Sequence, residues 1–181
     1  MRPAVFFDRD GTLLRFVDFL IDPASVELSP DVANALSRLR NAGFALIVIT
    51  NQSLIGRGLA TAEQVDQVNE EMNRKLHEAG SGIDAIYVCP IAPCGDDPTI
   101  VEHSDRKPGP GLLMRAAVEQ GIALERSWMV GDSVTDVLAG RNAGCFGQIL
   151  LTNGKSIGDD EIRKIGPVVT VPNLNKSSTR A

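Results

Sequence analysis

The chain has 181 residues, 43% of them hydrophobic, which suits one α/β domain with a full core and is short for two. Its 18 Lys and Arg against 23 Asp and Glu give a formal net charge of −5, so we expect no nucleic-acid partner and no membrane-surface binding. The apolar N-terminal segment is too short for a signal peptide or a membrane span, which favours a cytoplasmic protein.

The first predicted element is a buried strand over residues 3–8, and it ends in two carboxylates spaced one residue apart. Because side chains alternate along a strand, Asp8 and Asp10 can point the same way and face one reaction site. Gly11 then permits a sharp turn. A calcium-binding loop can begin in a similar way, but Thr12 stands at its third ligand position and no glutamate closes it.

The following segments repeat the order of helix and strand. A cap and a first-turn proline within residues 29–31 predict a helix that ends at Gly43, and the apolar run 44–49 predicts a second buried strand. A capping box opens a helix over 61–79, and a third strand is predicted over 83–88.

The second half of the chain begins with residues 89–108, which show no periodicity and predict a long loop. The remaining expected elements are helix 109–120, strand 127–130, helix 133–143 and strands 147–151 and 168–171. This alternation predicts a single doubly wound, Rossmann-like parallel sheet with helices on both faces. We expect one domain over residues 1–175, acting as a monomer, and a disordered tail over 176–181.

Polar residues follow each central strand of this predicted sheet. In such folds ligands bind at the carboxyl ends of the strands, so these residues should meet at one edge. Taken singly, each has another interpretation: Lys107 can be a solvated loop lysine, and Asp132 can be a helix cap. The residues expected to converge are Asp8, Asp10, Thr50, Asn51, Arg106, Lys107, Asp132 and Asp136.

Together these residues resemble the four motifs of the haloacid dehalogenase-like phosphatases. The first motif is residues 8–12, the second Thr50, the third Lys107, and the fourth Asp132 with Asp136. Their order and spacing agree from the N-terminus to about residue 154. The resemblance implies a phosphoric monoester hydrolase that acts on a small-molecule phosphate ester.

The resemblance also implies a role for each motif. Asp8 would attack phosphorus and form an aspartyl-phosphate, while Asp10 would protonate the leaving oxygen and then activate water. The hydroxyl of Thr50, the backbone N–H of Asn51 and the ammonium of Lys107 would bind the phosphoryl oxygens.

Magnesium is the cofactor that the resemblance implies. The ligands would be Asp8, the backbone carbonyl of Asp10, and Asp132, with Asp136 supporting the site without direct coordination. A hard divalent cation of this kind provides the local positive charge that the acidic chain lacks.

Further residues resemble one branch of the family, which contains heptose 1,7-bisphosphate phosphatase and the histidinol-phosphate phosphatase domain. They are Arg9, the segments 50–53 and 55–58, Cys89-Pro90 and the segment 106–108. The similarity to the heptose enzyme is closer, so the implied substrate is D-glycero-D-manno-heptose 1,7-bisphosphate. The alternatives are histidinol phosphate or a broad small-molecule phosphatase, and a non-catalytic phosphate-binding paralogue that would usually have lost Asp8 or Asp10.

The short spacing from the first motif to the helix near residue 29, and the short loop after Tyr87, leave no room for a large cap domain and predict an open site. Arg106, together with Arg57, would bind a second phosphate, whereas an amino alcohol would need an acid such as Asp18. The rest of the pocket would be lined by residues 16–19, Gln52 and Ser53.

The loop 89–108 departs from its relatives, which hold a structural zinc on a Cys-x-His and a Cys-x-Cys pair. Here the matching positions are Cys89, Ile91, His103 and Asp105, with Cys94 nearby. Two interpretations stay open: Cys89, Cys94, His103 and Asp105 form a rearranged tetrahedral zinc site, or the loop is metal-free and held by its prolines.

Overall fold

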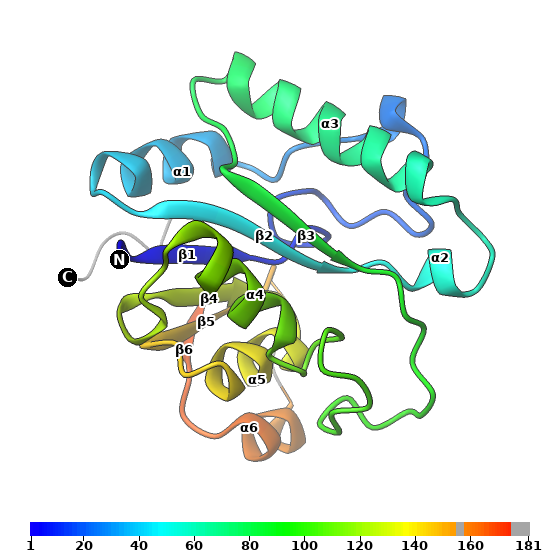
Figure 1. Ribbon diagram of the computed structural model, residues 1–181, viewed down its shortest axis with the longest axis vertical. Helices are drawn as coiled ribbons and strands as arrows, with labels where there is room; N and C mark the ends of the chain where they lie inside the picture. The colour runs from blue at the N-terminus through cyan, green and yellow to red at the C-terminus, as the bar shows by residue number, and fades with distance from the viewer. Residues whose placement is uncertain (155–157, 175–181) are drawn as a thin grey trace.

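The computed structural model describes residues 1–154 and 158–174, and within them it forms a six-stranded parallel sheet with helices on both faces (Figure 1). This architecture confirms the predicted doubly wound α/β fold. In spatial order the strands are β3 (Ala85–Cys89), β2 (Ala45–Asn51), β1 (Ala4–Phe7), β4 (Trp128–Gly131), β5 (Gly147–Leu151) and β6 (Val169–Val171).

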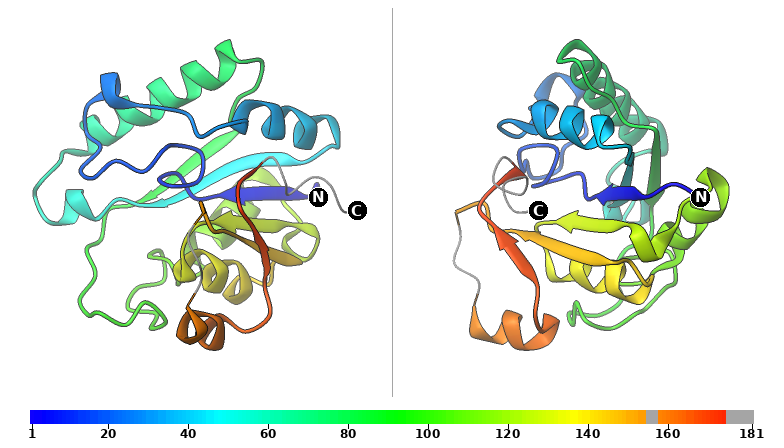
Figure 2. Two further views of the ribbon diagram at one scale, coloured as in Figure 1. Left: turned by 180° about the vertical axis from the view of Figure 1, so that it is seen from behind. Right: turned by 90° about the vertical axis from the view of Figure 1, so that its left-hand side faces the viewer.

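Five of the helices form the two outer layers (Figures 1 and 2). One face of the sheet is covered by α1 (Val32–Asn41) and α3 (Ala62–Glu78), and the other by α4 (Gly111–Gln120), α5 (Val134–Asn142) and α6 (Asp159–Ile165). A four-residue helix, α2 (Ser53–Gly56), follows β2 directly, and 3₁₀ turns lie at Pro23–Ser25 and Leu124–Arg126.

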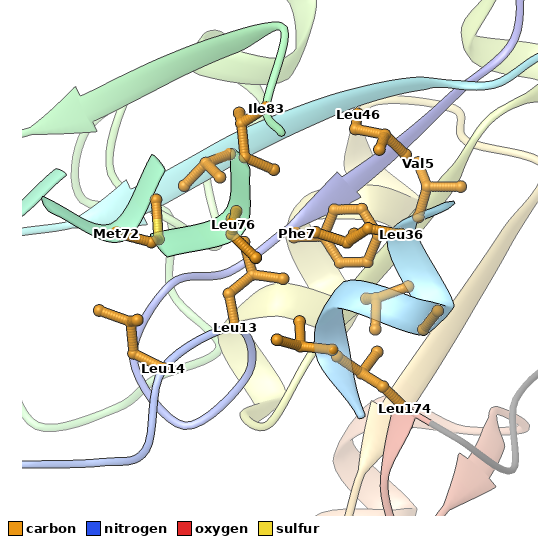
Figure 3. Packing of buried hydrophobic residues seen from close by; sticks show 14 of the residues in the cluster. Val5, Phe7, Leu13, Leu14, Leu36, Leu46, Met72, Leu76, Ile83 and Leu174 are labelled. Carbon is orange, nitrogen blue, oxygen red and sulfur yellow. The ribbon is translucent and has the colours of Figure 1, made fainter. Parts of the chain in front are cut away.

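The alternation of side chains in β1 builds the core on both faces of the sheet. Val5 and Phe7 pack into the cluster under α1 and α3, whereas Ala4 and Phe6 pack into the cluster under α4. All residues of β1 are buried, which is why this strand has no polar residue until its carboxyl end. Figure 3 shows the first cluster, in which Val5, Phe7, Leu13, Leu14, Leu36, Leu46, Met72, Leu76, Ile83 and Leu174 are labelled.

Local sequence signals set most helix boundaries. The capping box at the start of α3 is present: Gln64 N–H donates to Thr61 Oγ1 at 3.1 Å, and Thr61 N–H donates to Gln64 Oε1 at 2.9 Å. α1 starts at Val32, after Asp31 in a left-handed conformation with φ 60°. The helices α2 and α6 were not predicted, because four and seven residues are too few to show helical periodicity.

No cap domain is inserted after the first motif in the described ranges. Residues 13–29 leave the sheet and return, and their ends pair through Arg15 N–H to Glu27 O (2.9 Å) and Ser29 N–H to Leu13 O (2.8 Å).

No helix within the described ranges has both the length and the apolar composition that a bilayer span requires. The predicted tail, 176–181, lies outside the described residues.

Candidate active site

The polar side chains that follow β1, β2 and β4 lie at one edge of the sheet. Asp8 directly follows β1, and its backbone N–H donates to Val130 O at 2.9 Å, which ties the end of β1 to β4. Thr50 stands near the end of β2, and Asp132 directly follows β4. The loop between β3 and α4 brings Lys107 to the same edge, so residues far apart in sequence share one site (Figure 1).

A buried lysine joins two of the carboxylates. Lys107 Nζ lies 2.5 Å from Asp8 Oδ1 and 2.6 Å from Asp136 Oδ1, and it also donates to Ile49 O at 2.9 Å. Its side chain is only 3% exposed. These contacts use all three ammonium donors, so the amine is held at a single position between β1, β2 and α5.

Burial and neighbouring charges shift the ionisation of this pair. Burial raises the pKa of Asp8 to about 7, with the Asp136 and Asp10 carboxylates adding to the rise and Lys107 opposing it. Burial lowers the pKa of Lys107, but the carboxylates of Asp136 and Asp8 outweigh it and raise that pKa above its usual range. Lys107 is therefore a cation at neutral pH. The protonation of the neighbouring Asp8 carboxyl depends on the charges around it.

Three carboxylates form a cluster suited to a hard cation. Asp8, Asp132 and Asp136 each place an oxygen within 4.8 Å of the others, and no other group of this kind occurs in the described part of the chain. Carboxylate oxygens are the ligands that Mg²⁺ prefers, so this donor set fits magnesium. Gly11 makes room for the cluster, because a Cβ at its position would overlap the Asp132 carboxylate.

Asp136 is anchored at both of its oxygens. Oδ1 binds Lys107, while Oδ2 accepts hydrogen bonds from Ser133 N–H (3.0 Å) and Ser133 Oγ (2.6 Å) at the start of α5. The residue is 1% exposed. An acid with both oxygens occupied is better suited to orienting Lys107 than to direct reaction.

Asp10 is bound by a separate network. Arg9 approaches its carboxylate with Nε and Nη2, and Gln52 Nε2 donates to Asp10 Oδ2 at 2.8 Å. The same amide donates to Thr50 Oγ1 at 2.9 Å. Gln52 is buried and links the first two motifs, and its predicted place in the lining of the substrate pocket stays a prediction.

Asn51 holds the backbone of Lys107. Its Nδ2 donates to Lys107 O and its Oδ1 accepts from Lys107 N–H, both at 3.1 Å. The sequence predicts a role only for the backbone N–H of Asn51. A polar side chain at the end of a buried strand indicates that Asn51 has a hydrogen-bond partner. That partner, Lys107, is 56 residues away in sequence, so only the fold identifies it.

The predicted substrate-binding residues differ in position. Arg106 is partly buried, donates to Ile91 O at 2.7 Å, and lines a cavity of about 130 Å³ with Lys107. Ser53 is half-buried at the start of α2, whereas Arg57 is exposed just after α2 and does not line that cavity. Of the two predicted arginines, Arg106 therefore lies beside Lys107 in this cavity, whereas Arg57 does not.

The zinc interpretation of the loop after β3 is not supported. Cys89 is buried at the end of β3, where burial raises the pKa of its thiol, whereas Cys94 is exposed. With His103 and Asp105, they form no cluster of metal-binding spacing among the described residues. Instead, Glu102 accepts hydrogen bonds from the backbone N–H of Cys94 (2.8 Å) and of the next residue (2.5 Å). The Glu102 carboxylate thus ties residues 94 and 95 to the later part of the same loop.

Comparisons with known proteins agree with this geometry. A family model described as HAD-hydrolase-like matches residues 104–177. The D-glycero-beta-D-manno-heptose-1,7-bisphosphate 7-phosphatase of Pasteurella multocida (strain Pm70) is 36% identical over 160 residues, covering 88% of this chain and 87% of the relative. The enzyme of the same name from Escherichia coli (strain K12) is 36% identical over 156 residues, covering 86% and 82%.

A solved structure shows the same fold. The D,D-heptose 1,7-bisphosphate phosphatase of B. bronchiseptica, complexed with magnesium and phosphate, superposes with a TM-score of 0.80 at 29% identity and covers 95% of this chain and 93% of its own. The chain therefore belongs to the haloacid dehalogenase-like phosphatases. The relatives that place it there are phosphatases named for heptose 1,7-bisphosphate, so the predicted family and branch are confirmed.

Proposed function

We propose that this phosphatase hydrolyses D-glycero-D-manno-heptose 1,7-bisphosphate with magnesium, through an aspartyl-phosphate on Asp8. The observation that carries the proposal is the position of Asp8 directly after β1, hydrogen-bonded to the Lys107 ammonium and within 4.8 Å of an Asp132 carboxylate oxygen. Attack on a phosphate monoester requires a nucleophile and a site that offsets negative charge. This edge of the sheet supplies both.

The residues divide the reaction into two displacements. In the first, an Asp8 oxygen bonds to phosphorus while the bond to the ester oxygen breaks, and Asp10 gives that oxygen a proton. In the second, Asp10 takes a proton from water as the water oxygen displaces Asp8 from phosphorus. Thr50 and the backbone N–H of Asn51 bind the phosphoryl oxygens in both steps, and the Lys107 ammonium offsets the negative charge of those oxygens.

Magnesium is assigned to the carboxylate cluster. Phosphatases of this family use Mg²⁺, and the B. bronchiseptica structure contains it with phosphate. Asp8, Asp132 and the backbone carbonyl of Asp10 would hold the ion, while Asp136 acts through its contact with Lys107. When bound, magnesium neutralises charge on the phosphoryl group as a Lewis acid.

The substrate assignment rests on the names of the relatives and on Arg106. Both the P. multocida and the E. coli enzymes are named as 7-phosphatases of heptose bisphosphate. Arg106 lines the cavity beside Lys107, and we assign it the binding of a second phosphate or of sugar hydroxyls. We also propose that residues 1–175 act as one domain, monomeric and cytoplasmic.

Phosphate release from a panel of esters tests this function. Purified protein with Mg²⁺ should hydrolyse heptose 1,7-bisphosphate, assayed as both anomers, with a higher kcat/KM than hexose bisphosphates, hexose monophosphates or histidinol phosphate. Product analysis should show loss of the 7-phosphate. Excess EDTA should abolish the activity, and added Mg²⁺ should restore it. Preference for histidinol phosphate would overturn the substrate assignment, and full activity in EDTA would overturn the role of the metal.

A further inference from the structure

The two oxygens of the Asp10 carboxylate have unequal surroundings. Oδ2 accepts from Gln52 Nε2 at 2.8 Å, from Arg9 Nη2 at 3.0 Å and from Arg9 Nε at 3.3 Å. Among the contacts of the described residues, Oδ1 accepts only from Arg9 Nε, at 3.2 Å. Oδ2 is thus surrounded by N–H donors, which leaves Oδ1 as the oxygen with room for a further hydrogen-bond partner.

The group that sets this orientation is itself buried. Arg9 is 1% exposed, and a guanidinium at such depth needs partners for its N–H groups. Two of its nitrogens, Nε and Nη2, reach Asp10. The third, Nη1, donates at 2.8 Å to Asn69 Oδ1 on α3, 60 residues away in sequence.

Asn69 stands out on the face of α3 that contacts the core. The other buried side chains of this helix are apolar: Val65, Val68, Met72 and Leu76. An amide on this face costs burial free energy unless it is hydrogen-bonded, and the bond it makes is to Arg9. Its position predicts a role that an apolar residue could not fill.

We propose that Asn69 is a positioning residue that acts through Arg9: it fixes the guanidinium so that Asp10 presents Oδ1 to the leaving group and to water. The inference rests on the proposed function, in which Asp10 transfers protons. Without the Asn69 acceptor, Nη1 has a buried N–H to satisfy, and the guanidinium can rotate away from its forked contact with Asp10. The carboxylate then keeps only the Gln52 contact and loses its fixed orientation.

The chemistry of the leaving group separates this role from a general effect on folding. An alkyl phosphate such as the 7-phosphate of heptose bisphosphate leaves as a basic alkoxide and needs a proton from Asp10. p-Nitrophenyl phosphate leaves as a stable phenolate and needs little assistance. Because kcat/KM reports the steps up to the first irreversible one, the ratio of kcat/KM for the two esters measures proton donation in the first displacement.

The experiment compares four variants with the wild type at saturating Mg²⁺. Asn69→Leu and Asn69→Ala both remove the oxygen that accepts from Arg9 Nη1; leucine is larger than asparagine and alanine is smaller. Asn69→Asp keeps an oxygen for Arg9 Nη1. Val68→Ala is the matched control, since it truncates a buried neighbour in the apolar cluster beneath the same helix. Thermal unfolding of each variant reports its stability.

We expect Asn69→Leu and Asn69→Ala to lose about tenfold in kcat/KM with heptose bisphosphate and less than about threefold with p-nitrophenyl phosphate. Asn69→Asp should recover most of the loss, and Val68→Ala should leave the ratio unchanged while lowering the melting temperature. If Asn69→Leu does not fold, Asn69→Ala decides.

Equal losses with both esters, or no loss in a folded variant, would overturn the inference while leaving the phosphatase assignment intact. Failure of the wild-type protein to hydrolyse either ester would instead overturn the proposed function.

Discussion

Replacing Lys107 by methionine tests the charge arrangement at the centre of the site. Methionine keeps an unbranched, flexible side chain but removes the ammonium that binds Asp8 Oδ1 at 2.5 Å and Asp136 Oδ1 at 2.6 Å. In the magnesium-free protein, two buried carboxyl groups then face each other without a cation. Removing one partner of a buried ion pair typically destabilises a protein by about 3–5 kcal/mol.

The stability lost in Lys107→Met should depend on pH, because Asp8 becomes neutral when it binds a proton. In the wild type the folded pKa of Asp8, about 7, lies above the unfolded value of about 3.9. The unfolded state releases its proton first, so the Asp8 contribution to stability falls as the pH rises to about 7 and then levels off. Loss of Lys107 raises that pKa further, so in the variant the fall continues above pH 7, by up to about tenfold in the folding equilibrium constant per pH unit.

Urea unfolding followed by circular dichroism, in EDTA at pH 6 and pH 8, measures both effects. We expect Lys107→Met to lose about 3–5 kcal/mol at pH 8 and distinctly less at pH 6. The control is Lys75→Met, whose wild-type ammonium donates to Val26 O at 2.6 Å on a partly exposed surface. That variant should lose about 1 kcal/mol at either pH. Equal losses of Lys107→Met at the two pH values, or a loss no larger than the control, would refute the reasoning.

Asp8→Asn should abolish phosphate release in the ester assay while the circular dichroism spectrum stays native, because the amide is not a nucleophile; near-normal turnover would remove Asp8 from the mechanism. Gly11→Ala should weaken Mg²⁺ binding, measured by titration calorimetry, because its Cβ would overlap the Asp132 carboxylate and its φ is +77°. The control Gly43→Ala carries the same kind of backbone strain, at φ +89°, with nothing within 4 Å of the Cβ, and it should bind Mg²⁺ like the wild type. Equal Mg²⁺ affinities of the two glycine variants would contradict the steric account.

The loop after β3 and the helix α3 contain features that local sequence patterns do not predict. Cys89, Cys94, His103 and Asp105 are close in sequence and have metal-binding chemistry, but among the described residues they form no cluster of metal-binding spacing. The sequence around Asn69 carries no signal of a role, since one polar residue within an amphipathic helix is common. Its importance depends on Arg9, which only the packing of α3 against the first motif brings within 2.8 Å.

The sequence by itself determined the order of strands and helices. It also determined that polar residues follow the carboxyl ends of the central strands. Those properties depend on periodicity and capping over a few neighbouring residues, as in β1 and at Thr61. Only the tertiary structure decided which oxygen atoms meet the Lys107 ammonium, which side of Asp10 stays open, and that Gln52 turns inward. Such contacts join segments about 40 to 100 residues apart, and they depend on burial and charge that no local pattern contains.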